Sequence, residues 1–231
     1  MNSIELRIAG RFNGPPDSGN GGYVAGLMGT AIGGSGATVT LHRPPPLDRP
    51  LTLCATDQGV ELLDGEQRIA SGVPEGLQID IPEPPALAVA RSAEARYVGH
   101  HRHRFTSCFV CGPERRPGDG LAIYPGDVGT QLAATWTPAS DLADTDGNVR
   151  REFLWAALDC PGYFAVEEIA GLAVLGRMTA RIERDVPAGK PLIVTGWAIA
   201  SKGRKHHVGT ALHDAAGGLV AAARSTWITI A

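Results

Sequence analysis

The sequence predicts an α+β protein built from two similar copies, each with one apolar helix packed on antiparallel strands. In both halves, short segments alternate apolar and polar residues, which is typical of half-buried strands. In both halves a polar loop leads into an apolar helix. Aligning Asn20 with Arg150 brings the two helices into register, NGGYVAGLMG over RREFLWAALD. The halves therefore look like copies of one unit.

The first copy reads as a strand, a helix and then a meander of strands. Its opening segment alternates and carries charges, so we expect a strand and not a signal peptide. Pro44-Pro45-Pro46 ends the first strand after the helix, because proline cannot donate to a ladder. The predicted elements are a strand over 1–12, a helix from Gly22 to about Ala31, and strands over 37–43, 51–59 and 60–72, with a hairpin turn at Asp64-Gly65.

The second copy repeats this order after a segment rich in proline, charge and histidine. We expect a first unit over 1–81, a linker over 82–104 and a second unit over 105–231. Its helix is too apolar to lie on a surface, as is the first. The predicted elements are strands over 121–125 and 130–138, a helix from Asn148 to about Ala170 interrupted at Pro161-Gly162, and strands over 175–186, 192–201, 206–214 and 219–230.

Composition excludes several classes of protein. The 231 residues are 43 % apolar with a net charge of −3, so no overall basic field predicts a nucleic-acid partner. No apolar run reaches the roughly 20 residues that span a bilayer, and no membrane partner is expected. Four cysteines in a chain of this length do not form a disulfide framework. We therefore expect a cytoplasmic protein.

The order of elements and the Gly-Gly helix start resemble the hotdog fold of acyl-CoA thioesterases and dehydratases, over nearly the whole chain. Family members often carry Asn, then His-Gly-Gly, then Asp or Glu two helical turns later. Here Asn13 and Asn20-Gly21-Gly22 match the first part, with Asn20 where His is common. The acidic position is Gly29 in one copy and Asp159 in the other. The resemblance implies a double hotdog, two antiparallel sheets each wrapping a central apolar helix.

The resemblance also implies an active site between the copies. One copy's helix start would polarise a thioester carbonyl, and the other's carboxylate would activate water or attack directly. The physics agrees, because thioester hydrolysis needs oxyanion stabilisation, which helix N–H groups provide, and a base, which a half-buried carboxylate provides. The implied roles are oxyanion donor for Gly21 with Gly22 beside it, base or nucleophile for Asp159, positioning of water or carbonyl for Asn13 or Asn20, and orientation of the water for Thr179.

Structural interpretations of the same residues stay open. The two glycines would also relieve crowding where a helix meets a sheet, and Asp159 would also suit a helix kink before Cys160-Pro161. Asn13 is a common turn former and Thr179 a common strand residue. Glu152 suits a helix N-terminus electrostatically and is the first substitute if Asp159 is not the base.

Cys108 and Cys111 have the spacing of metal ligands, and three histidines, His100, His101 and His103, lie close by in the sequence. A full zinc site usually shows two such pairs, and this chain has one. We assign no metal and prefer a structural turn with small packed cysteines, while zinc remains the alternative. A similar Cys-Phe-x-Cys-Gly element occurs in hotdog-like proteins of uncharacterised function.

The function expected from this reading is hydrolysis of an acyl-CoA or acyl-carrier thioester, with no cofactor. Arg204 and Lys205 lie in a cationic loop that would bind the phosphates of coenzyme A or form a solvated hairpin tip. The alternatives are a hotdog hydratase or dehydratase and a non-catalytic acyl-thioester binding module. We also expect a homodimer or larger homo-oligomer, and only one working site of the two that the repeat offers.

Overall fold

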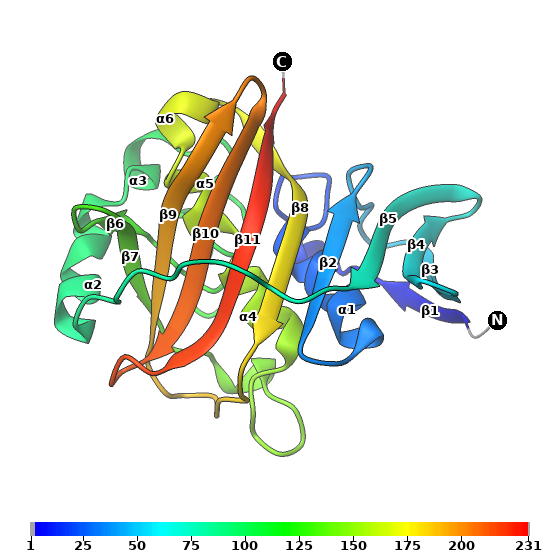
Figure 1. Ribbon diagram of the computed structural model, residues 1–231, viewed down its shortest axis with the longest axis horizontal. Coiled ribbons are helices and arrows are strands. Elements are labelled where there is room, and N and C mark those ends of the chain that lie inside the picture. Colours follow the sequence, from blue (N-terminus) through cyan, green and yellow to red (C-terminus); the bar gives the residue numbers. More distant parts are fainter. Residues whose placement is uncertain (1–2, 231) are drawn as a thin grey trace.

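The computed structural model describes residues 3–230 and has a curved, continuous antiparallel sheet around buried helices (Figure 1). Across the described residues its eleven strands run in the order β1-β3-β4-β5-β2-β8-β11-β10-β9-β7-β6. Their bounds are β1 Ser3–Arg7, β2 Gly36–Leu41, β3 Pro50–Thr56, β4 Gly59–Asp64, β5 Gln67–Pro74, β6 Gly126–Asp127, β7 Leu132–Trp136, β8 Ala173–Ile182, β9 Leu192–Lys202, β10 Lys205–Asp214 and β11 Leu219–Thr229.

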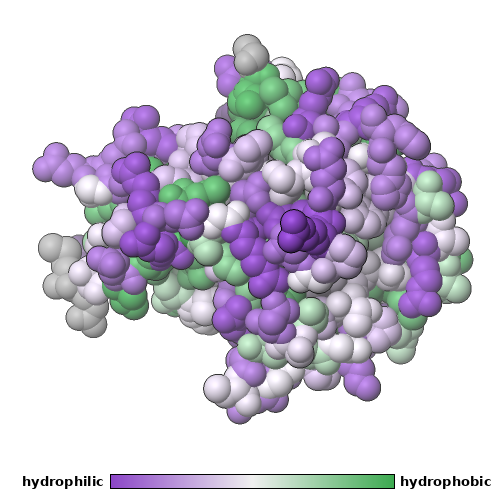
Figure 2. Space-filling view, turned by 180° about the vertical axis from the view of Figure 1, so that it is seen from behind, coloured by the Kyte–Doolittle hydropathy of each residue, from purple (hydrophilic) through white to green (hydrophobic). Residues whose placement is uncertain are grey.

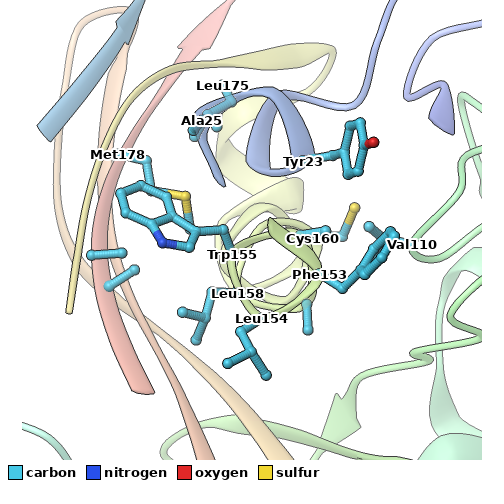
Figure 3. Packing of buried hydrophobic residues seen from close by; sticks show 14 of the residues in the cluster. Tyr23, Ala25, Val110, Phe153, Leu154, Trp155, Leu158, Cys160, Leu175 and Met178 are labelled. Carbon is cyan, nitrogen blue, oxygen red and sulfur yellow. The ribbon is translucent and has the colours of Figure 1, made fainter. Parts of the chain in front are cut away.

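The helices are short, and two of them, α1 and α4, pack side by side inside the curve of the sheet (Figures 1 and 3). The α-helices are α1 Gly21–Ile32, α2 Leu87–Ala93, α3 Gly99–Arg102, α4 Arg151–Ala157, α5 Cys160–Phe164 and α6 Glu167–Ala170, and the 3-10 helices are η1 Gly10–Phe12, η2 Glu94–Arg96 and η3 Ser140–Leu142. None of the helices in the part of the chain described here has the length and apolarity to cross a membrane.

The loops that lead into the two buried helices have the same backbone hydrogen bonds, which confirms the register predicted from the sequence. A 3-10 helix precedes each loop, η1 in the first copy and η3 in the second. Asn20 N–H donates to the Phe12 carbonyl at 2.8 Å, and Arg150 N–H donates to the Leu142 carbonyl at 3.0 Å. Asn20 and Arg150 are the N-cap residues of α1 and α4. Gly29 and Asp159 are therefore counterparts in the repeat.

The expected division into two sheets is not seen. Strand β2 of the first copy pairs directly with β8 of the second, with Thr38 opposite Thr179, so the strands of both copies join. Each copy would otherwise end there in an unpaired strand edge, and pairing satisfies the backbone N–H and C=O groups of both. The two buried helices thus share one curved sheet.

Three further expectations differ from the structure. The strand predicted over 1–12 is limited to β1, because the 3-10 helix η1 forms where Phe12 N–H donates to the Ala9 carbonyl, and residues 1–2 lie outside the described range. Residues 121–125 form no strand, because Ile123 N–H donates to the Val110 carbonyl instead of to a neighbouring ladder. The second buried helix breaks at Leu158 and Asp159, before Pro161 and Gly162. Proline is tolerated there because it lies in the first turn of α5, where its missing N–H would be unpaired anyway.

The segment between the two copies is partly helical and partly extended. Residues 75–86 cross the outer face of the sheet, and α2, η2 and α3 follow at the β6–β7 end (Figure 1). Leu77, Ile79 and Ile81 pack against Trp197 of β9 and its neighbours. This apolar strap covers part of the sheet face opposite the buried helices.

Candidate active site

Asp159 lies at the break between α4 and α5, where its side chain is 2 % exposed. Its Oδ2 accepts hydrogen bonds from Asn20 Nδ2 at 2.8 Å and from Gly22 N–H at 3.0 Å. Both donors belong to the other copy. Its Oδ1 is also buried and accepts no hydrogen bond from any of the described residues. One carboxylate oxygen is therefore held by two hydrogen bonds, and the other has no partner among the described residues.

Burial governs the acidity of this carboxyl group. Removal from water raises the pKa of Asp159 to about 7, while the hydrogen bonds from Gly22 and Asn20 pull it down and the nearby Cys108 pushes it up. Such a group exchanges a proton near neutral pH, as a general base must. Buried, perturbed carboxyl groups that face a cavity are typical of functional sites.

Asn20 and the first turn of α1 supply the hydrogen-bond donors around Asp159. Asn20 Oδ1 caps the helix by accepting from Tyr23 N–H at 2.9 Å, which turns its Nδ2 toward Asp159. Gly22 N–H is used by Asp159, and Val24 N–H bonds the Asn20 carbonyl. Within residues 3–230 no group accepts from Gly21 N–H, so this donor of the first turn remains available.

The glycines of α1 also allow the two buried helices to touch. A Cβ at Gly22 would lie 2.6 Å from Asp159 Cβ and 2.8 Å from the Trp155 carbonyl oxygen. Gly26 and Gly29 face α4 in the same way, against Glu152 and Trp155. The close-packing interpretation and the site interpretation of Gly22 are therefore compatible, because the close approach places Asp159 on the helix start.

A cavity of about 560 Å³ opens beside Asp159 and Gly21, between the two copies. Its walls are mainly apolar and include residues of β8 and β11, such as Leu175 and Ile228. Figure 2 shows apolar surface next to the C-terminal end of the chain, where Ile230 lines the cavity. The exposed side chains of Arg43 and Arg104 also line it. The cavity offers an apolar chamber with cationic groups in its wall.

The counterpart of this site in the repeat is closed. Gly29 stands where the acid would be, and a Cβ there would lie 2.6 Å from Cζ2 of the Trp155 indole. Figure 3 shows Trp155 directed from α4 toward Met178 of β8. The space left beside Gly29, Arg151 and Trp155 is about 20 Å³. Glu152 lies at the start of α4, with an ion pair to Arg150 at 3.3 Å.

Several residues singled out in the sequence do not line the cavity. Asn13 is buried in its own loop, where Nδ2 donates to Ser107 Oγ at 3.1 Å and Oδ1 accepts from Arg115. Thr179 Oγ1 lies 2.5 Å from Thr38 Oγ1 at the β2–β8 junction. Arg204 bonds the Thr229 carbonyl at the β9–β10 turn, and Lys205 is exposed beside it.

The structure brings in residues that sequence reasoning missed. Arg43 precedes the Pro44-Pro45-Pro46 run and Arg104 ends the His-rich segment at 100–104, and nothing in the sequence indicated that both would line one cavity. Cys160 is buried in the core, and its thiol also lies 3.7 Å from that of Cys108 in the cavity wall. The signal that could have found it is its place directly after Asp159.

Comparison with known proteins supports the fold. No family model matches the chain, and no curated protein matches its sequence. Among solved structures, the tesB protein of Mycobacterium avium subs paratuberculosis superposes with a TM-score of 0.65 at 12 % identity, covering 99 % of this chain and 93 % of the other. A candidate thioesterase from Novosphingobium aromaticivorans gives 0.67 at 12 % identity, with 99 % and 96 % covered. Acyl-CoA thioesterase II TesB2 from Mycobacterium marinum gives 0.59 at 13 % identity, with 99 % and 93 % covered.

These similarities span nearly the full length of both partners in each comparison. The chain therefore has the fold of the full-length thioesterase structures, which agrees with the double hotdog expected from its repeat.

Proposed function

We propose that this protein hydrolyses an acyl-CoA or related acyl thioester in the cavity between its two copies. The observation that carries the proposal is the Asp159 carboxylate. One oxygen is fixed by Asn20 and Gly22 of the other copy, and the other is unpaired and buried at the cavity wall. The thioesterases named among the structural neighbours support the same reaction class.

Asp159 is the general base in this mechanism. Its Oδ1 takes a proton from water, and the oxygen of that water adds to the thioester carbonyl carbon. The resulting oxyanion accepts a hydrogen bond from Gly21 N–H at the start of α1, where the helix dipole also stabilises negative charge. The tetrahedral intermediate then collapses and expels the thiolate. The same geometry supports a variant in which Oδ1 attacks the carbonyl carbon, the C–S bond breaks to release the thiolate, and water hydrolyses the resulting mixed anhydride to the free acid and the Asp159 carboxylate.

The acyl chain and the phosphate groups of the substrate match the apolar and cationic residues that line the cavity. An acyl chain would lie against the apolar residues of β8 and β11. Arg43 and Arg104 would bind phosphate groups of the carrier, because neither guanidinium forms an ion pair with any residue in the described range. We therefore place the carrier at the Arg43 and Arg104 side rather than at the hairpin tip with Arg204 and Lys205.

The test is incubation of the purified protein with a panel of acyl-CoA esters of different chain length and a chromogenic thiol reagent. We expect release of free coenzyme A from at least one ester, at a rate proportional to enzyme concentration. Loss of an enoyl chromophore without thiol release would instead show a hydratase. Protection from thermal unfolding without any turnover would show a binding module.

A further inference from the structure

Three buried cysteines from two separate parts of the chain meet in the cavity wall. Cys108 and Cys111 come from the turn before residue 113, and Cys160 is the first residue of α5. Their sulfur atoms all lie within 4.8 Å of one another, and the Cys108 and Cys160 sulfurs are 3.7 Å apart. Their side chains are 4 %, 2 % and 5 % exposed. All of the cysteines in the described chain are free thiols.

The 3.7 Å between the Cys108 and Cys160 sulfur atoms matches one edge of a tetrahedral metal site, and the third sulfur lies within 4.8 Å of both. With Zn–S bonds of about 2.3 Å, two thiolates at tetrahedral positions are separated by about 3.8 Å. Packing alone does not require three thiols to converge, since a thiol is a weak hydrogen-bond donor and acceptor. A thiophilic cation such as Zn²⁺ binds more tightly where several thiolates converge.

A tight backbone turn brings Cys108 and Cys111 together. Gly112 N–H donates to the Cys108 carbonyl at 2.9 Å and closes the turn. A Cβ at Gly112 would lie 2.6 Å from the Cys108 nitrogen, so this closure needs glycine. The turn therefore holds the Cys108 and Cys111 sulfur atoms within 4.8 Å of each other.

His103 lies beside this cluster but outside it. Its Nδ1 accepts from Phe105 N–H at 2.9 Å, which places the proton of the neutral ring on Nε2. Nε2 lies 3.3 Å from the Cys111 sulfur and therefore donates to it. Asn20 Nδ2 points at the Cys108 sulfur from the other side, at 4.0 Å. Donors of this kind stabilise metal-bound thiolates without binding the metal.

We propose that Cys108, Cys111 and Cys160 bind one Zn²⁺ ion, with His103 as an outer-sphere partner of Cys111. The fourth ligand is a water molecule or another small donor on the cavity side, because all three cysteines line the cavity. The ion would tie the turn at 108–112 to the start of α5. It would thereby fix the residue that directly follows Asp159. This inference does not depend on the proposed hydrolysis.

The first experiment uses the unaltered protein. Zinc content is measured by mass spectrometry as purified, and the protein is then stripped by a chelator under reducing conditions and titrated with Co²⁺. We expect one Co²⁺ per chain, with a thiolate-to-cobalt charge-transfer band and the visible bands of tetrahedral cobalt, and displacement of Co²⁺ by added Zn²⁺. Absence of binding by the stripped, reduced protein would overturn the proposal, as would binding without a charge-transfer band.

The second experiment uses four cysteine variants. Cys108→Ser, Cys111→Ser and Cys160→Ser should each bind Co²⁺ more than about 100-fold more weakly, a loss beyond that of an outer-sphere partner. Cys54→Ser is the matched control, because Cys54 lies on β3 outside the cluster, and it should keep full affinity. Unchanged affinity in all three cluster variants would refute the site.

Two further measurements test the role of His103 and distinguish a metal site from a disulfide. His103→Ala should weaken Co²⁺ binding by about 10-fold and keep the charge-transfer band, and a loss as large as that of the cysteine variants would overturn its outer-sphere role. Four free thiols should be counted in the protein as purified, after denaturation in the presence of a chelator and without any reductant. A count of two would show a disulfide in the cluster in place of a metal site.

Discussion

At the scale of single residues, the candidate site depends on the different hydrogen bonding of the two carboxylate oxygens of Asp159. Oδ2 receives two hydrogen bonds from the start of α1, and Oδ1 receives none from the described residues. A structural aspartate at a helix kink would be expected to satisfy both oxygens, because an unpaired buried acceptor costs about 1–3 kcal/mol. The unpaired oxygen is therefore better explained by a substrate or water in the cavity.

Asp159→Asn should lower kcat for the responsive acyl-CoA ester by about 100-fold or more, as expected when a general base is removed. The amide keeps the size of the side chain, so binding of a non-hydrolysable thioether analogue should be unchanged by calorimetry. Steady-state kinetics with thiol detection measures the first effect. Wild-type turnover in this variant would reject Asp159 as the base, and Glu152 would then be tested in the same way.

Gly22→Ala should lower kcat and stability together. The added methyl group would lie 2.6 Å from Asp159 Cβ and must displace the carboxylate from Asn20. Overpacking of this kind costs about 1–3 kcal/mol in unfolding free energy. Gly29→Ala is the matched control on the same helix, since its methyl group would meet Trp155 away from the cavity. Denaturant unfolding and kinetics of both variants should show similar destabilisation but a loss of turnover only at Gly22.

At the scale of elements, alternation and turn residues predicted most of the strands correctly, and the hairpin at Asp64-Gly65 is confirmed, with Gly65 at a φ of 59°. The site was harder to predict, because its geometry depends on contacts between copies. The approach of Gly22 to Asp159 follows from helix–helix packing, and the meeting of Cys160 with Cys108 follows from the placement of the 103–112 segment. Neither leaves a periodic signal in the sequence.

The break between α4 and α5 is held by a buried hydroxyl group on the sheet. Thr210 Oγ1 of β10 donates to the Leu158 carbonyl at 2.8 Å, which the break has freed from the helix. Thr210→Val removes this donor at nearly constant shape, so the unfolding free energy should fall by about 1–3 kcal/mol. Thr195→Val on neighbouring β9 is the control, because the buried Thr195 hydroxyl has no partner among the described residues. Chemical denaturation should show little or no loss there, and equal losses in both variants would contradict the role of Thr210.

At the scale of the whole molecule, the sheet ends in two different edges. β6 is short and lies against α2 and η2, whereas β1 forms the other edge and carries Ile4, which is 63 % exposed. An exposed edge with an apolar residue invites pairing with a second copy. We expect a homodimer through β1 that Ile4→Lys converts to a monomer, measured by light scattering. Val89→Lys on α2 is the control and should remain dimeric. A wild-type monomer across micromolar concentrations would contradict this prediction.

The repeat predicted from the sequence offers two related sites, but the molecule has kept only one of them open. The proposed site joins the glycine helix start of the first copy to the acid of the second. At its counterpart the Trp155 ring lies against Gly29, and the remaining space of about 20 Å³ cannot hold an acyl thioester. The sequence showed which residues each copy lacks, and the structure adds a steric reason.

The proposal of one active site per chain has two measurable consequences. Asp159→Asn should bind a non-hydrolysable acyl-CoA analogue with a calorimetric stoichiometry of one per chain. Adding Gly29→Asp to that variant should not restore turnover. The new carboxylate would collide with the Trp155 indole, and α4 begins with Arg151 and Glu152 in place of glycines. A stoichiometry of two, or recovery of thiol release in the double variant, would show that the second site is accessible. The asymmetry between the copies would then lie in the missing acid alone.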